Sequence, residues 1–397
     1  MPSATSSQFD GLPLEEVSRR VAKARELILD EVHKRIIGQT DVLEQMLIGL
    51  FSQGHCLAIG VPGLAKALAV STLARTLGLR YQRVPLTPDM TPTDLAGEER
   101  LEDEPSSGRR VPRFWPGPLF TQMLLADDFN HAAPKTQALL LQAMQESQAT
   151  VAGKSHPLAP PFFVLATQNP ADPQAAFPLH EATLDRFALS ILLGYPSRDE
   201  ERRIVETSSA PAGDEVRVIL RASDICQIQR IVHQLPASRS VVDYAVDLVR
   251  ATRPTEPDSP KFIRHWLSWG AGPRATQCLL ACAKARALLK GRHAVHAADI
   301  RWVAKPVLRH RLALNPTAIA QRVTLEPLLD QLLHCVRENR SDSPLPTMPI
   351  LEMVDTPHTN ETALAAPELP PSARSSPHDP SPAASAAHAW PPSRPSS

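Results

Sequence analysis

The chain has 397 residues and a mass of 43.4 kDa, which exceeds what one hydrophobic core usually serves, so we expect two domains or more. Its 42 Lys and Arg equal its 42 Asp and Glu in number, and this balance argues against a protein that binds nucleic acid through the phosphate backbone. No apolar run reaches the roughly 20 residues that cross a bilayer, and the N-terminus lacks the apolar core of a signal peptide. Together with five scattered cysteines, interpreted as reduced core thiols, these features predict a cytoplasmic protein without a membrane segment.

The first part of the chain predicts two helices followed by a strand, a loop and a helix. Apolar residues at helical spacing predict the two helices within residues 14–52, with a break at Gly38. The apolar run at residues 55–59 predicts a buried strand, and residues 66–77 predict a helix. A glycine-containing loop at residues 60–65 joins them, so this segment forms the first half of a βαβ unit.

Two further apolar runs predict buried strands at residues 123–126 and 162–166, and Pro134 begins a helix between them. Continuous apolar strands that alternate with helices predict an α/β fold with a parallel sheet covered on both faces. Polar residues follow both strands, and we expect them at the carboxyl edge of the sheet, where such folds bind ligands.

Changes in composition predict the domain boundaries. An α/β domain at residues 14–205 follows a flexible N-terminus at residues 1–13, and a linker at residues 206–222 leads to an all-α domain at residues 223–338. Residues 339–397 are rich in Pro, Ser and Ala and cannot bury enough apolar area to offset chain entropy, so we expect a disordered tail.

Two segments inside the first domain predict surface hairpins, one at residues 97–115 around the turn at residues 105–108 and one at residues 150–160. In the second domain the cluster Arg309-His310-Arg311 is interpreted as a solvated face.

The loop after the first strand partly matches the template of a phosphate-binding loop, G-x-x-x-x-G-K-[ST]. Such a loop needs glycines so that backbone N–H groups turn toward the phosphates, a lysine to reach them, and a hydroxyl to bind Mg²⁺. Gly60, Gly63 and Lys66 fit the template, whereas Ala65 and Ala67 depart from it. The predicted nucleotide-binding residues are Gly60, Val61, Pro62, Gly63, Leu64, Ala65, Lys66 and Ala67.

Three polar residues at the predicted strand ends complete a triphosphate site. Asp127 is predicted to hold Mg²⁺, Asp128 to orient the attacking water, and Asn169 to contact the γ-phosphate or that water. The alternative interpretation of the two aspartates is a solvated pair at a strand end. If the site exists, Lys66, Asp127 and Asn169 converge at one edge of the sheet.

Taken together, the motifs resemble those of the MoxR family of AAA+ ATPases between about residues 36 and 311. They are 37–39 IGQ, 60–63 GVPG, 87–89 TPD, 114–118 FWPGP, 134–137 PKTQ, Glu146, 162–170 FFVLATQNP, 184–187 LDRF and 194–196 GYP. The resemblance implies a P-loop αβα domain that binds ATP and Mg²⁺, a helical lid, and ring-shaped oligomers, usually hexamers. It also implies that Arg186 is similar to an arginine finger, that Arg274 in Gly272-Pro-Arg274 is similar to a sensor-2 residue, and that the first hairpin is similar to a helix-2 insert. Arg186 acting in an ion pair within its own subunit is the alternative.

Two departures from the family pattern predict weak hydrolysis. Ala67 offers no oxygen to Mg²⁺, and loss of an interaction with a charged group costs about 1.5–3 kcal/mol, or roughly 10- to 150-fold in affinity. Asp128 stands where glutamate is usual and sets its carboxylate back by about one C–C bond, and a displacement of about 1 Å costs on the order of 10²-fold in rate. We therefore expect ATP to bind and to be hydrolysed slowly or not at all.

Three functional classes fit the sequence. The first is a chaperone-like motor or regulator that acts on a partner protein, and the resemblance suggests a partner with a von Willebrand A-type domain. The second is a nucleotide-sensing scaffold without hydrolysis, which Ala67 and Asp128 favour. The third, a nucleic-acid AAA+ machine, is disfavoured by the balanced charge.

Overall fold

The computed structural model describes residues 7–103, 109–170, 172, 177–208 and 215–336. All of these residues belong to one compact unit, Met1–Ile350. The predicted disordered tail at residues 339–397 and the hairpin turn at residues 105–108 lie outside the described residues.

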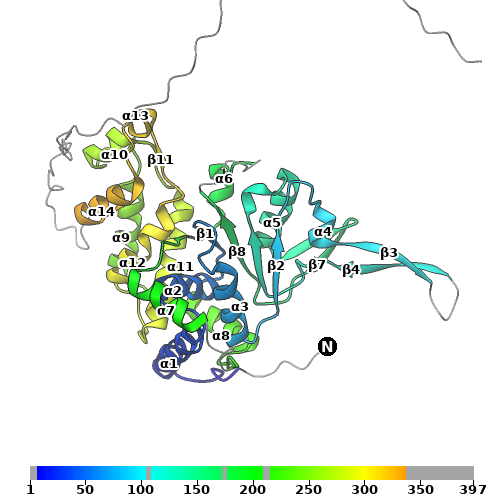
Figure 1. The fold of residues 1–397 in the computed structure, drawn as a ribbon. Helices are drawn as coiled ribbons and strands as arrows, with labels where there is room; N and C mark the ends of the chain where they lie inside the picture. Colours follow the sequence, from blue (N-terminus) through cyan, green and yellow to red (C-terminus); the bar gives the residue numbers. More distant parts are fainter. Residues whose placement is uncertain (1–6, 104–108, 171, 173–176, 209–214, 337–397) are drawn as a thin grey trace, which may run out of the picture. The chain divides into compact units, whose positions relative to one another are not determined.

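A five-stranded parallel sheet forms the centre of the first part of the chain (Figure 1). Its strand order is β2-β5-β8-β1-β9, with the bounds β1 Cys56–Ile59, β2 Tyr81–Pro85, β5 Met123–Asp127, β8 Phe163–Gln168 and β9 Leu189–Leu192. The three strands predicted from apolar runs occupy the centre of the sheet, and the parallel α/β fold is confirmed. The two edge strands, β2 and β9, were not predicted.

The sheet is buried on both faces, because alternate residues of its strands belong to two different hydrophobic clusters. In β5, Met123 and Leu125 pack into the larger cluster, whereas Leu124 and Ala126 pack into the smaller one. The larger cluster includes residues of α1 (Leu14–His33), α2 (Thr40–Phe51) and α3 (Lys66–Thr76). The smaller one includes residues of α5 (Pro134–Glu146). Shorter helices join the strands, namely α4 (Pro92–Ala96), η1 (Phe129–His131) and α6 (Glu181–Leu184). After the last strand, α7 (Arg198–Ser208) leads out of the sheet toward the second part of the chain.

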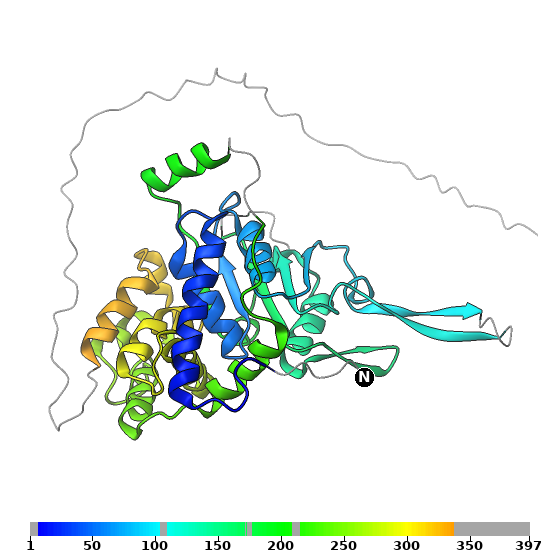
Figure 2. The same ribbon diagram turned by 90° about the horizontal axis from the view of Figure 1, so that it is seen from below.

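Both predicted hairpins are present as antiparallel pairs. β3 (Gly97–Asp103) pairs with β4 (Arg110–Pro116) and extends away from the sheet, as Figure 2 shows. β6 (Gln148–Val151) pairs with β7 (Lys154–Pro157) and begins slightly earlier than predicted.

The second part of the chain is a helical lid, as predicted. Its helices are α8 (Ala222–Gln234), α9 (Arg239–Arg250), α10 (Lys261–Trp266), α11 (Pro273–Leu289), α12 (Ala297–Leu308), α13 (Pro316–Ala320) and α14 (Leu325–Cys335). α11 is the central helix, because it contacts α1 and α2 as well as α8, α9 and α12. The lid also contains a short antiparallel pair, β10 (Leu267–Trp269) and β11 (Ala313–Leu314).

The described part of the N-terminal segment makes specific contacts with the lid. The Ser7 hydroxyl and the Gln8 backbone N–H both donate to Oδ1 of Asp224 in α8, at 3.0 and 2.9 Å. Phe9 is only 2% exposed. These contacts fix the chain just before α1 begins.

The interpretation of Arg309-His310-Arg311 as a solvated face is wrong, because all three residues are largely buried and join the end of α12 to β9 and the residues before it. Arg309 Nη1 donates to the carbonyl of Ser190 at 2.7 Å, and the ring Nε2 of His310 donates to the carbonyl of Phe187 at 3.0 Å. Arg311 donates to the Asp185 carboxylate at 2.8 Å and also to the Phe187 carbonyl at 2.6 Å. Charged side chains are tolerated here because the backbone carbonyls of this segment accept their hydrogen bonds.

His55, which precedes β1, gives the fold a pH dependence. Its Nε2 donates to the Met144 carbonyl at 2.9 Å, and its Nδ1 accepts from the Val164 backbone N–H at 3.1 Å, so the ring is neutral. Burial lowers the pKa of His55 to about 4. Because the unfolded chain then binds the proton more tightly, the contribution of neutral His55 to the free energy of unfolding is complete above pH 6.5. It is lost as the pH falls from about 6.5 to about 4.

We expect the free energy of unfolding to fall by about 3 kcal/mol over this window through His55. His310, whose pKa burial also lowers, acts in the same direction. The pKa of Glu31 is lowered to about 2 by Lys34 and Arg217, so its contribution is lost only below about pH 4.5. Urea unfolding of the wild type and of His55→Gln at pH 6.5 and 4.5 is the measurement, and an equal loss in both proteins contradicts the assignment to His55.

No helix of the described residues is both long and apolar enough to cross a membrane.

Candidate nucleotide site

The loop between β1 and α3 contains two left-handed residues and leads directly into the N-terminus of a helix. Gly63 has φ +87°, and a Cβ at this position would meet nothing within 4 Å, so the loop lies open. Ala65 also adopts a left-handed conformation, with φ 54°, although it carries a side chain. A left-handed alanine costs about 1–2 kcal/mol, and strain of this kind concentrates at functional sites. The loop ends at the N-terminus of α3, where free backbone N–H groups favour anions.

Lys66 is the first residue of α3 and turns back toward its own loop. Its Nζ donates to the carbonyl of Gly60 at 2.6 Å. Burial lowers the pKa of Lys66, while the carboxylates of Asp127 and Asp128 raise it. The ammonium group therefore lies within the electrostatic field of both aspartates, as the predicted site requires.

Asp127 and Asp128 are fastened to the neighbouring strand β8 through one hydroxyl. Thr167 Oγ1 donates to Asp127 Oδ1 at 2.6 Å and accepts from the backbone N–H of Asp128 at 2.9 Å. Asp128 follows β5 in a left-handed conformation, with φ 55°, which Asp tolerates better than most residues. Thr167 was not among the predicted site residues, although a threonine at the end of an apolar strand is a signal for such a role. Its side chain is fully buried, so its hydroxyl needs the partners it has.

Asn169 lies one residue beyond β8, the strand that separates β5 from β1. The backbone N–H of Gly60 donates to the Gln168 carbonyl at 3.2 Å, so the loop begins directly beside Asn169. The sheet therefore brings Lys66, Asp127 and Asn169 to the same carboxyl edge.

Arg83 belongs to the same edge and was not among the predicted site residues. It lies in β2, and its Nε donates to Asp127 Oδ2 at 3.0 Å, with a second hydrogen bond from Nη2 to the same oxygen. This pairing raises the pKa of Arg83. β2 buries one of its five residues, so no apolar run marks it as a strand and no pattern places Arg83 beside Asp127.

The residues at this edge offer one carboxylate to a magnesium ion, and an ion held there would keep most of its water. Asp127 supplies a carboxylate at the position where the resemblance places the metal, and Mg²⁺ in proteins is commonly bound through one or two carboxylates plus phosphates. At position 67 the structure has a methyl group packed on the larger hydrophobic cluster, and no oxygen.

Arg186 and Arg274 lie together elsewhere. Both line a cavity of about 620 Å³ together with Gly54, His55 and Gln145, and Arg186 Nη1 donates to Gln145 Oε1 at 2.7 Å. This cavity is at the amino end of β1, whereas Lys66 and its loop are at the carboxyl end. The five residue steps from His55 to Gly60 span roughly 16 Å of extended chain. Neither arginine therefore joins the Lys66 site of its own chain.

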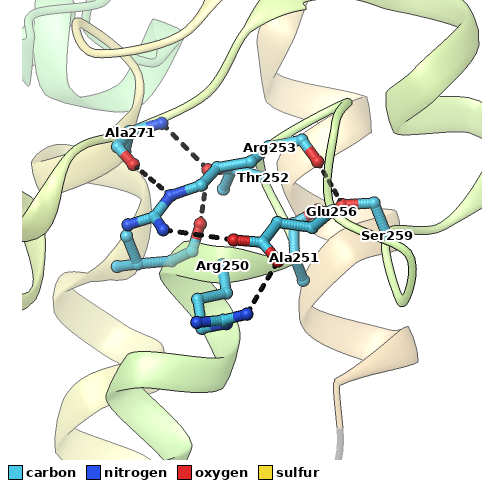
Figure 3. A network of polar contacts seen from close by, with 8 residues as sticks. Arg250, Ala251, Thr252, Arg253, Glu256, Ser259 and Ala271 are labelled. Atoms are coloured by element: carbon cyan, nitrogen blue, oxygen red, sulfur yellow. Dashed lines mark hydrogen bonds and ion pairs between the residues drawn. The ribbon is translucent and has the colours of Figure 1, made fainter.

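A polar network holds the segment that leads to Arg274 (Figure 3). The Thr252 hydroxyl accepts from the Ala271 backbone N–H at 2.9 Å, and Arg253 Nε donates to the Ala271 carbonyl at 3.0 Å. A Cβ on Gly270 would lie 2.2 Å from the Thr252 carbonyl oxygen, so only glycine permits this approach. The network fixes the chain three residues before Arg274, at the start of α11.

Family models match both parts of the chain. Residues 55–189 match the model described as "ATPase family associated with various cellular activities (AAA)", and residues 264–332 match an AAA lid domain. The fold and the comparisons thus define an AAA ATPase with its lid.

Individual relatives narrow the assignment. "Chaperone MoxR1" of Mycobacterium tuberculosis is 39% identical over 77% of this chain and 80% of its own length. "Protein MoxR" of Paracoccus denitrificans is 31% identical over 74% of this chain and 90% of its own length. A protein of Cytophaga hutchinsonii solved by crystallography has a TM-score of 0.75 at 34% identity, over 81% of this chain and 97% of that one. The chain belongs to the MoxR family of AAA ATPases.

Proposed function

We propose that the protein binds ATP with Mg²⁺ at the carboxyl edge of the sheet and couples the bound nucleotide to a partner protein. The observation that carries this proposal is the convergence of Lys66, Asp127 and Asn169 beside the open loop at residues 60–65. Lys66 and the loop N–H groups hold the phosphates, and Asp127 holds the metal. The metal, when bound, offsets the charge of the β- and γ-phosphates. Asp128 and Asn169 face the attacking water and the γ-phosphate.

We infer that hydrolysis is slow. Ala67 leaves the metal with one fewer protein oxygen, and Asp128 holds its carboxylate short of the position a glutamate would reach. Because the two defects affect metal binding and water orientation separately, their effects on turnover compound. Lys66 and the loop N–H groups contact the phosphates independently of these two residues, so nucleotide binding is retained.

The positions of Arg186 and Arg274 support an oligomeric ring. Both arginines line one cavity away from the nucleotide loop of their own chain, so we propose that they contact the nucleotide held by a neighbouring copy. A head-to-tail interface of this kind forms a ring when its rotation closes, and a hexamer is the ring that family membership favours.

The proposed action is chaperone-like remodelling or regulation of a partner, as the name of the Mycobacterium tuberculosis relative suggests. A protein with a von Willebrand A-type domain is the proposed class of partner, and the compartment is the cytoplasm. The second candidate is a nucleotide-sensing scaffold without hydrolysis, which the methyl group at position 67 favours. Action on nucleic acid is disfavoured by the balanced charge.

Affinity for MgATP and turnover, measured on the same preparation of the full chain, test this proposal. The expected result is saturable ATP binding with turnover well below the median of about 10 s⁻¹ for enzymes. Brisk turnover contradicts the inferred defects, absence of turnover selects the scaffold, and absence of binding overturns the nucleotide site.

A further inference from the structure

Arg83 donates its hydrogen bonds to the carboxylate oxygen of Asp127 that Thr167 does not contact. Thr167 holds Oδ1, and Arg83 directs both Nε and Nη2 to Oδ2. A carboxylate oxygen has two lone pairs, so the two donors of Arg83 use both acceptor positions of Oδ2. Each oxygen of the carboxylate proposed to bind the metal thus already has a protein donor.

The placement of Arg83 follows from the sheet. β2 and β5 are parallel neighbours in which Arg83 is paired with Leu125 and Pro85 with Asp127. Arg83 is therefore a diagonal neighbour of Asp127, a separation that a long side chain bridges. The Arg83 side chain is 53% exposed, whereas that of Asp127 is 14% exposed. The arginine can leave into solvent while the aspartate stays in place.

We propose that Arg83 is the resident counter-cation of Asp127 and competes with Mg²⁺ for its carboxylate, an inference that rests on the proposed nucleotide site. Without metal, the guanidinium neutralises Asp127, which otherwise repels the phosphates of ATP. With metal, the ion gains the carboxylate only as Arg83 withdraws, and position 67 contributes no oxygen that would help it compete. ATP affinity in this protein therefore depends only weakly on Mg²⁺.

The proposal predicts two effects of opposite sign when Arg83 is replaced. Arg83→Gln lowers the affinity for ATP in the presence of EDTA, because Asp127 is then an uncompensated negative charge near the phosphates. The same variant also lowers the Mg²⁺ concentration at which half of the effect of Mg²⁺ on ATP binding is reached. The reason is that the ion then has no side chain to displace from Asp127. Because an ion pair this exposed to solvent is weak, we expect the change in ATP affinity and the change in half-saturating Mg²⁺ concentration each to be about two- to fivefold.

The test is equilibrium binding of a fluorescent ATP analogue to the full chain across a series of Mg²⁺ concentrations. Arg80→Gln is the matched control, because it removes an exposed arginine immediately before β2, three residues from Arg83. Arg83→Lys keeps the charge and should give intermediate values. Circular dichroism establishes that each variant is folded. If Arg83→Gln does not fold, the comparison of Arg83→Lys with the wild type is the test.

Equal half-saturating Mg²⁺ concentrations for the wild type, the Arg83 variants and Arg80→Gln overturn the role of Arg83 while leaving the nucleotide site intact. A wild type that binds no ATP at any Mg²⁺ concentration overturns the proposed function itself. The two failures are thus distinguishable in one titration.

Discussion

Replacing Ala67 with Thr and Asp128 with Glu in the same chain is expected to raise the rate of ATP hydrolysis on the order of 10²-fold or more. The threonine returns a metal-binding hydroxyl to the start of α3, an interaction worth about 1.5–3 kcal/mol. The glutamate extends its carboxylate by about 1.5 Å toward the attacking water. Steady-state phosphate release at saturating MgATP is the measurement.

The single variants separate the two contributions. Ala67→Thr is expected to act mainly on the Mg²⁺ requirement, and Asp128→Glu mainly on the maximal rate. Because position 128 is left-handed, a glutamate there is less favourable for the backbone than the aspartate, so the melting temperature is recorded beside the rate. If the double variant folds, binds MgATP and is no faster than the wild type, then these two residues are not what limits hydrolysis.

Mixing two inactive variants is expected to restore hydrolysis, because the proposed active site is completed by a neighbouring copy. Lys66→Ala removes the phosphate-binding lysine, and Arg186→Ala removes the arginine that acts across the interface, a loss on the order of 10³-fold. In a randomly mixed ring, about a quarter of the sites combine an intact Lys66 with an intact neighbouring Arg186. Lys66→Ala and Arg186→Ala are introduced separately, each into the faster chain that carries Ala67→Thr and Asp128→Glu.

The control for mixing is the pair of variants measured alone and a chain that carries both substitutions. Activity of the mixture near a quarter of the parent value supports a site shared between copies. Activity that stays at the level of the separate variants contradicts it and returns Arg186 to a role within its own subunit, where it already bonds to Gln145. The same design with Arg274→Ala tests the second arginine of the cavity.

The part of the fold that could be predicted from the sequence is the part whose pattern is local. β1, β5 and β8 are apolar up to their carboxyl ends because both faces of the central sheet are buried, and polar residues mark the ends of β5 and β8. Lys66 and Asp127 could therefore be assigned to one edge of the sheet from the sequence. β2 could not be predicted, since only one of its residues is buried, and Arg83 was lost with it.

Tertiary contacts account for what the sequence misassigned or left open. Arg311 lies in a basic cluster of a kind typical of solvated surfaces, yet it donates to the Asp185 carboxylate and the Phe187 carbonyl, each more than a hundred residues away. The position of Arg274 beside Arg186 depends on how α11 packs against α2, which no local pattern contains. Contacts of this kind follow from the packing of the lid and not from propensity.

The affinity of the full chain for ATP, compared between the wild type, Lys66→Ala and Lys154→Ala, tests the central claim most directly. Lys154 is an exposed lysine of β7 paired with Glu99, so its replacement removes the same charge away from the site. Loss of the contact between Lys66 and the phosphates should weaken binding about 10- to 150-fold, while Lys154→Ala binds as the wild type does. Equal affinities for all three proteins would contradict a nucleotide site at the β1–α3 loop.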